Sequence, residues 1–139
     1  MDFVIDTKNF LVDTNIFLEI LLDQEKSNEC QEIFKLNYKY FISDFSLYSI
    51  GIILIKHRKQ NVLLDFIQDL FNNIDIIRID LDDLNSFYDI VNNSEKFRLD
   101  FDDAYQYTIA KKNNLLIISY DNHFDKTDIK RIEPKEFFN

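Results

Sequence analysis

Short apolar runs alternate along this chain with longer amphipathic stretches. The runs are too brief for helices and predict buried strands at 10–12, 40–42, 74–79, 115–118 and 129–132. Between them, apolar residues recur at helical spacing and predict helices at 16–21, 28–36, 45–59, 62–71, 84–91 and 102–112. Continuous apolar strands that alternate with amphipathic helices are typical of the α/β class. They predict a central parallel sheet that is flanked by helices on both faces.

Length and composition favour one domain over residues 1–139. The chain has a single Gly, a single Pro and no linker-like tract. Cys30 is its only cysteine, so no internal disulfide framework exists and nothing indicates an oxidising compartment. No apolar run has the length of a membrane span, and the first residues lack the basic region of a signal peptide. We therefore expect a cytoplasmic protein with no membrane partner.

The net charge of −9 argues against tight, nonspecific binding to nucleic acid. It argues less strongly against catalysis on nucleic acid, because bound cations would reverse the local field of clustered carboxylates. A surface of this charge could also attract a basic partner protein.

Three acids stand where an α/β sheet places its chemistry. Asp13 directly follows the first strand, Asp121 follows the strand at 115–118, and Asp103 lies in the first turn of a later helix. Ligands bind beyond the carboxyl ends of parallel strands, so we expect these three side chains to converge there. Such a cluster needs a cation, and hard oxygen ligands suit Mg²⁺ or Mn²⁺.

Each acid also has an ordinary structural interpretation. Asp13 could cap the helix that follows it, and Asp121 could be a turn residue. For Asp100 and Asp102 we prefer the structural interpretation, in which they cap the helix at 102–112 and complement its dipole.

Three ordered motifs resemble those of the PIN-domain nucleases. They are Leu-Val-Asp-Thr-Asn at 11–15, Asp-Asp-Ala-Tyr at 102–105 continuing to Ala110, and Ile-Ile-Ser-Tyr-Asp-Asn-His-Phe at 117–124. The similarity spans about residues 10–134, and in size the chain looks most like VapC-type toxins of toxin–antitoxin pairs. The resemblance implies a metal-dependent endoribonuclease that is often a homodimer and is neutralised by a cognate antitoxin. Asp13, Asp103 and Asp121 would then be its catalytic and metal-binding residues.

One position departs from the family pattern. PIN domains usually carry a Glu on the helix after the second strand, and Ser49 stands there in this chain. Asp44, at the start of that helix, is a candidate fourth acid, although it could equally be an N-terminal acid that stabilises the helix. The missing carboxylate could weaken metal binding. The alternative is therefore a PIN-like module that no longer cleaves and acts through protein or RNA contacts.

Several other residues complete the expected site. Thr14, Asn15 and Ser119 would hold the carboxylates or their bound waters. Lys56 and Arg58, in the densest basic run, could contact the substrate, although a solvated helix end explains such a run equally well.

Other enzymes and residues fit the sequence less well. A lone His123 beside Phe124 is more often structural. A haloacid-dehalogenase-type phosphatase would need a second Asp where Asn15 stands, and a receiver domain would need a late strand-end Lys that is missing here. A DNA nuclease remains open, because metal ligands do not distinguish ribose from deoxyribose.

Overall fold

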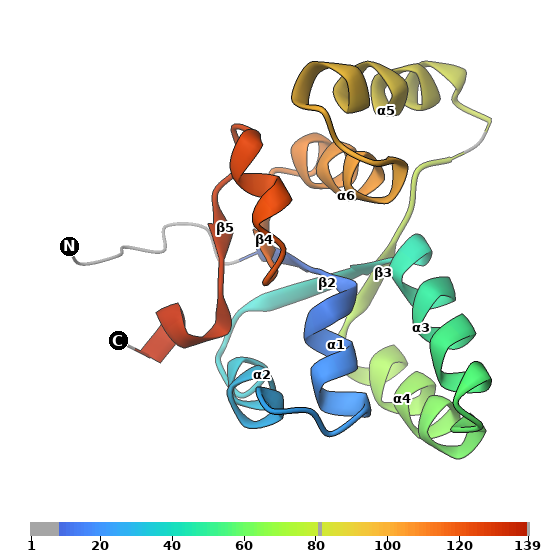
Figure 1. Cartoon of the computed structure of the whole chain (residues 1–139), viewed down its shortest axis with the longest axis vertical. Coiled ribbons are helices and arrows are strands. Elements are labelled where there is room, and N and C mark those ends of the chain that lie inside the picture. The colour runs from blue at the N-terminus through green and yellow to red at the C-terminus, as the bar shows by residue number, and fades with distance from the viewer. Residues whose placement is uncertain (1–8, 81, 139) are drawn as a thin grey trace.

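The computed structural model describes residues 9–80 and 82–138. Its five strands form one parallel sheet in the order β3-β2-β1-β4-β5 (Figure 1). They are β1 Asn9–Val12, β2 Lys39–Ser43, β3 Asp75–Ile77, β4 Leu116–Ile118 and β5 Arg131–Ile132. The predicted α/β class with a central parallel sheet is confirmed.

Strand β1 lies at the centre of the sheet, where the strand order reverses. Phe10 is in register with Tyr40 of β2 on one side and with Leu116 of β4 on the other. Chain connections therefore leave the carboxyl end of β1 in one direction and the carboxyl end of β4 in the other. A reversal of this kind opens a crevice above the two strand ends, which is where α/β proteins bind ligands.

Two layers of helices cover the sheet (Figure 1). The layer on one face is α1 Thr14–Leu21, α2 Ser27–Ile33, α3 Asp44–Lys56 and α4 Gln60–Asn73. The layer on the other face is α5 Leu84–Phe97 and α6 Phe101–Lys112, with the short 3-10 helix η1 Asn122–Lys126 beside them. A second 3-10 helix, η2 Pro134–Phe138, follows β5.

Side-chain alternation along the strands divides the core between these layers. Phe10 and Val12 of β1 pack with the first layer, whereas Leu11 between them packs with the second. In β4, Ile118 packs with the first layer and Ile117 packs with the second. All five side chains are fully buried, so β1 and β4 are covered on both faces, as their continuous apolar sequences predict.

The predicted helix at 45–59 is shorter in the structure and ends at Lys56. Arg58 has a left-handed backbone with φ 57°, and the Lys59 amide closes the turn by donating to the Leu54 carbonyl. The basic run that the sequence places inside a helix therefore begins at the last residue of α3 and continues through the turn before α4.

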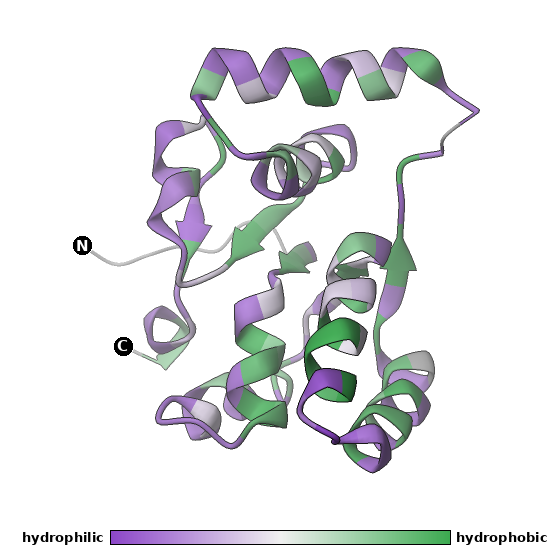
Figure 2. Ribbon diagram, turned by 45° about the vertical axis from the view of Figure 1, so that its right-hand side comes forward, coloured by the Kyte–Doolittle hydropathy of each residue, from purple (hydrophilic) through white to green (hydrophobic). Residues whose placement is uncertain are grey.

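The strand predicted at 74–79 is also shorter, because the chain leaves the sheet after Ile77. The Ile79 amide donates to the Tyr105 hydroxyl at 3.0 Å, which attaches this segment to α6. Helix α5 instead runs six residues beyond the predicted end at Val91. Its added part is polar, and Asn93 contacts Thr108 of α6 through a 3.0 Å hydrogen bond. Hydrophilic and hydrophobic positions alternate along α5 (Figure 2).

Over the described ranges 9–80 and 82–138, none of the helices combines the length and the apolar character that a membrane span requires.

Candidate active site

Asp13 lies between the carboxyl end of β1 and the start of α1, and four groups donate hydrogen bonds to its carboxylate. Oδ1 accepts from the Thr14 amide at 2.8 Å and from Nε2 of Gln106 at 3.3 Å. Oδ2 accepts from the Ser119 hydroxyl at 2.6 Å and from Nδ2 of Asn15 at 3.3 Å. The bond from the Thr14 amide shows that Asp13 caps helix α1, as the structural interpretation of this residue predicts. The other three donors exceed what a cap requires.

The Asp13 side chain is also buried, with only 8% of the residue exposed. Burial raises the pKa of its carboxyl, the hydrogen bonds from Ser119, Gln106 and Thr14 lower it, and the nearby charge of Asp121 raises it again. Four donors therefore hold the carboxylate in one orientation, and a second acid lies close enough to repel it.

Ser119 and Asn15 join the segment after β4 to the segment after β1. Asn15 Nδ2 donates to the Ser119 hydroxyl at 3.2 Å, and its Oδ1 accepts from the Tyr120 amide at 3.3 Å. The Ser119 hydroxyl in turn accepts from the Asp121 amide at 2.9 Å. These contacts place the Asp121 backbone near Asp13, although the two residues are far apart in sequence.

Thr14, the third predicted supporting residue, acts through a neighbour. Its hydroxyl donates to Ser46 Oγ at 2.8 Å, and the same oxygen accepts from Gln106 Nε2 at 2.8 Å. Ser46 thus joins the start of α1 to Gln106 of α6. Gln106 in turn donates a hydrogen bond to Asp13.

Asp103 and Asp121 meet at the imidazole of His123. Nδ1 of His123 lies 3.1 Å from Oδ2 of Asp103 and 3.1 Å from Oδ1 of Asp121. Burial, and then the charges of Asp121 and Asp102, raise the pKa of the Asp103 carboxyl to about 6. The charge of Asp121 therefore disfavours the ionised form of Asp103 when no cation is present.

One cavity of about 340 Å³ collects the three acids. Asp13, Asp103 and Asp121 all line it, so the structure places the sequence-predicted acids around one space, although Asp13 is not in the tighter ligand group to which Asp103 and Asp121 belong. Among the described residues that line it there is no Lys or Arg. The other lining residues are Thr14, Asn15, Leu18, Phe45, Ser46, Ser49, Ile53, Asp102 and Gln106.

The donor set at and beside the cavity suits a divalent cation. Asp103, Asp121 and His123 each offer one ligand atom, and these atoms all lie within 4.8 Å of one another. Gln106 is 3% exposed, and its Oε1 has no hydrogen-bond partner among the residues that the structure describes. Clustered oxygen donors of this kind, with a buried amide oxygen left over, fit an ion such as Mg²⁺ or Mn²⁺ with its bound water.

Asp44, the candidate fourth acid, does not line this cavity. Its Oδ1 accepts a 2.6 Å hydrogen bond from the Tyr105 hydroxyl and a 2.8 Å bond from the Phe45 amide. Its position at the first residue of α3 thus gives it a structural role, and we do not count it among the acids of the site. Ser49 does line the cavity, and it is the residue that stands where the PIN resemblance predicts a Glu.

Lys56 and Arg58, the predicted substrate contacts, are both exposed and do not line the cavity. Lys56 lies on the face of α3 that carries Ser49 and Ile53, because positions i, i+4 and i+7 share a helix face. Arg58 lies beyond the end of the helix, in the turn before α4.

Four residues of the site were absent from the sequence prediction or were assigned another role. Gln106 and Ser46 were not singled out, Asp102 was assigned to the helix dipole, and His123 was assigned a structural role. The signal for Gln106 was its position one turn after Asp103 on the same helix. For His123 it was the spacing of two residues from Asp121.

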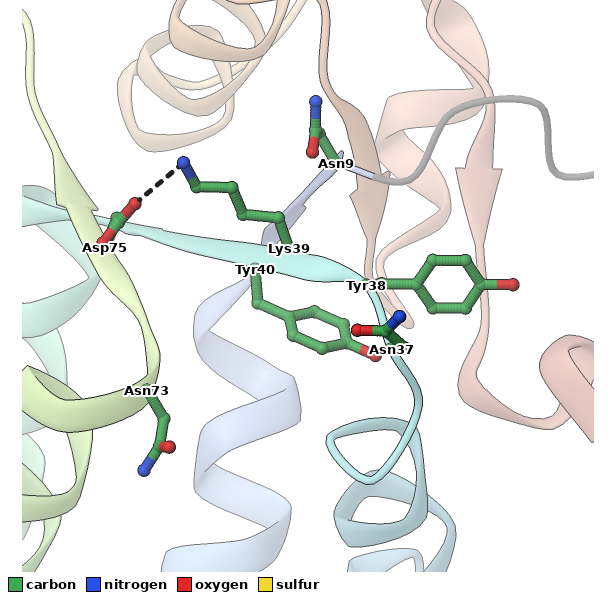
Figure 3. A pocket seen from close by; sticks show the side chains of 7 residues that line it. All are labelled: Asn9, Asn37, Tyr38, Lys39, Tyr40, Asn73 and Asp75. Carbon is green, nitrogen blue, oxygen red and sulfur yellow. Dashed lines mark ion pairs between the residues drawn. The ribbon is translucent and has the colours of Figure 1, made fainter.

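A second cavity, of about 360 Å³, lies around the opposite, amino-terminal ends of β1 to β3 (Figure 3). Among the described residues that line it, Asp75 is the one acid, and it forms an ion pair with Lys39 at 3.3 Å. This described lining has no group of converging carboxylates, so the cavity around Asp13 is the better candidate for chemistry.

Comparison with known proteins agrees with the three sequence motifs. The family model of the PIN domain matches residues 10–130. No curated protein sequence matches this chain as a relative.

Solved structures with the same fold include a toxin and a toxin–antitoxin complex. VapC20 from Mycobacterium tuberculosis, a Sarcin-Ricin loop cleaving toxin, has a TM-score of 0.73 at 12% identity, covering 90% of this chain and 99% of that one. A toxin–antitoxin complex from Klebsiella pneumoniae has a TM-score of 0.70 at 20% identity, with 90% and 97% covered. VapBC2 from Rickettsia felis, bound to a DNA fragment from their promoter, has a TM-score of 0.70 at 15% identity, with 90% and 98% covered. At these identities the similarity is one of fold.

Proposed function

This chain belongs to the PIN domain family, and from that premise we propose that it is a metal-dependent endoribonuclease that hydrolyses RNA phosphodiester bonds. The observation that carries the proposal is the meeting of Asp13, Asp103 and Asp121 in one cavity above the strand-order reversal. These acids come from three separate segments. If each acid were only a helix cap or a turn residue, there would be no reason for the three to line the same cavity.

We assign the metal to Asp13, Asp103 and Asp121, with Mg²⁺ and Mn²⁺ as the candidate ions. When bound, such an ion would activate a water molecule and neutralise charge on the phosphate and the leaving oxygen. Hydrogen bonds from Ser119, Asn15 and Gln106 fix the Asp13 carboxylate. The carboxylate therefore needs no rearrangement before it binds the metal ion.

Substrate binding depends on local charge, because the whole chain is acidic. Lys56 continues the cavity face of α3 and is our first candidate for a phosphate contact. Arg58 follows it in the turn and could extend the contact along an RNA strand. No side chain in the cavity has an evident role in reading a base, so we propose that RNA shape and single-stranded character select the substrate.

We further propose that the protein is the toxin of a toxin–antitoxin pair and acts in the cytoplasm. The structure from Klebsiella pneumoniae is a toxin–antitoxin complex by name, which supports a cognate antitoxin. This chain has exposed apolar side chains that suit protein contacts and a homodimer. They are Tyr48, Ile52 and Ile55 on α3, and Leu84, Phe87, Tyr88 and Val91 on α5.

One observation favours a second candidate function. Ser49 lines the cavity and has no carboxylate, so the site has one acid fewer than the family pattern. A PIN-like module that binds RNA or protein without cleaving it is therefore the alternative. Such a module would bind RNA without shortening it, and millimolar Mg²⁺ would not stabilise it.

The test is cleavage of structured RNAs and single-stranded DNA by the purified chain with Mg²⁺, Mn²⁺ or EDTA. We expect RNA to be cut with either metal and to stay intact in EDTA. Asp121→Asn should lose the activity, and Asp69→Asn, which removes an exposed charge on α4, should keep it. RNA cleavage by Asp121→Asn at the parent rate would rule out the proposed site.

A further inference from the structure

The imidazole of His123 faces the acids rather than the core. The residue is the second of η1, and its amide donates to Asp121 Oδ1 at 2.9 Å. Its side chain is 52% exposed, whereas the next residue, Phe124, is fully buried and packs into the core. Phe124 therefore anchors this segment in the core. Packing of the core does not require a histidine at position 123.

A hydrogen bond accounts for only one of the two contacts of this imidazole. Nδ1 lies 3.1 Å from both Asp103 Oδ2 and Asp121 Oδ1. One ring nitrogen carries at most one hydrogen, so it can donate a well-aligned bond to one of the two oxygens. A cation beside the three atoms would satisfy both carboxylates and the nitrogen lone pair together.

The spacing of these atoms also matches that of ligands around one ion. Donors at adjacent corners of an octahedron, each about 2.1 Å from the metal, lie about 3 Å from each other. Both distances from His123 Nδ1 have this value. The unpartnered Oε1 of Gln106 lines the same cavity and is an acceptor available to a water molecule of the ion.

We infer that His123 is a ligand, through Nδ1, of the cation that Asp103 and Asp121 hold, and that this nitrogen makes the site prefer Mn²⁺ to Mg²⁺. The inference rests on the metal-dependent function proposed above. Mg²⁺ takes oxygen ligands almost exclusively, whereas imidazole suits transition metals and carboxylate also suits Mn²⁺. The imidazole adds a protein donor to a site in which Ser49 offers no carboxylate.

The chain contains its own control, because His57 is its only other histidine. His57 follows the last residue of α3 and is exposed. It is not in the ligand group that His123 forms with Asp103 and Asp121. A nitrogen signal from the bound metal can therefore be assigned to one imidazole by comparing two single variants.

The experiment is pulsed electron paramagnetic resonance of Mn²⁺ bound to the full chain, on the parent, His123→Ala and His57→Ala. Directly coordinated imidazole gives a ¹⁴N modulation, which we expect in the parent and in His57→Ala and not in His123→Ala. Mn²⁺ affinity should fall by about tenfold or more in His123→Ala, while Mg²⁺ affinity changes far less. His123→Gln, which keeps a polar side chain, replaces the Ala variant if that variant does not fold.

Two outcomes overturn the inference in different ways. If Mn²⁺ binds the parent without ¹⁴N modulation, or if the modulation persists in His123→Ala, His123 is not a ligand, and the carboxylate site and the proposed function still stand. If neither Mn²⁺ nor Mg²⁺ binds the parent, the inference and the metal-dependent function fail together.

Discussion

The Ser119 hydroxyl donates a 2.6 Å hydrogen bond to Oδ2 of Asp13, across 106 positions of sequence. It joins the segment after β4 to the segment after β1, the two central strands at which the order of the sheet reverses. The bond shows how two strand ends that are distant in sequence come together at one site.

Replacing Ser119 by Ala should weaken the site and destabilise the fold. The variant removes a hydrogen bond to a buried carboxylate and leaves the Asp121 amide without its acceptor. We expect the free energy of unfolding in denaturant to fall by about 1.5–3 kcal/mol and metal affinity to fall by about 10–100-fold. Ser49→Ala is the control, because Ser49 lines the same cavity without a side-chain hydrogen bond to the described residues. Equal effects of the two changes would show that the Ser119 bond has no special role.

Replacing Ser49 by Glu should strengthen metal binding, because it places a fourth carboxylate in the cavity. Cation affinity rises with the number of charged ligands, and we expect a gain of about tenfold in a calorimetric titration with Mg²⁺. The metal-free protein should become less stable, since the added charge repels Asp13 and Asp103. Gln68→Glu adds the same charge at an exposed position on α4 and should change neither quantity. Unchanged metal affinity in Ser49→Glu would mean that this face of α3 does not reach the ion.

The stability of the metal-free protein should fall as pH rises through the weakly acidic range. Burial and the neighbouring Asp121 and Asp102 raise the pKa of Asp103 from 3.8 to about 6, so the folded chain holds this proton more tightly than the unfolded chain. Stability therefore decreases with pH between about 4 and 6, which is opposite to the effect of a paired carboxylate. Thermal unfolding in EDTA across this window measures the effect. Asp103→Asn should flatten it, and a parent protein that gains stability over the window would refute the assignment.

Asp44 should behave as a structural residue. Asp44→Ala removes the acceptor of the Tyr105 hydroxyl and of the Phe45 amide, and we expect a loss of about 1–3 kcal/mol in unfolding free energy. Metal affinity should stay at the parent value, because Asp44 does not line the cavity. Asp65→Ala, an exposed change on α4, should alter neither. A large loss of metal binding in Asp44→Ala would restore it as the fourth acid.

Local sequence patterns predicted the architecture, and their errors lie at element ends. Phe10 to Val12 and Leu115 to Ile118 are apolar at every position because both faces of β1 and β4 are covered, and that pattern is visible without a structure. The end of α3 was missed because it depends on the left-handed backbone at Arg58. The added length of α5 depends on polar contacts such as that of Asn93 with Thr108. Neither the turn at Arg58 nor the polar contacts of α5 produce a periodic pattern of apolar residues in the sequence.

The site was predicted where it depends on topology and missed where it depends on packing. Asp13 and Asp121 follow neighbouring parallel strands, so their convergence is a consequence of the fold class. Gln106 is one of eight consecutive buried residues on α6. Only the placement of that helix over the strand ends shows that its amide faces Asp13. The burial of Phe124 similarly turns His123 toward the acids, which a sequence pattern does not reveal.

The most direct test of the central claim is a calorimetric titration of the full chain with Mg²⁺ and with Mn²⁺. It compares the parent with Asp13→Asn, Asp103→Asn and Asp121→Asn, and uses Asp69→Asn as the control. We predict that each of the three variants loses the same binding event and that the control retains it, because the three carboxylates form one metal centre. Binding at the parent affinity in any of the three, with the fold intact, would contradict that claim.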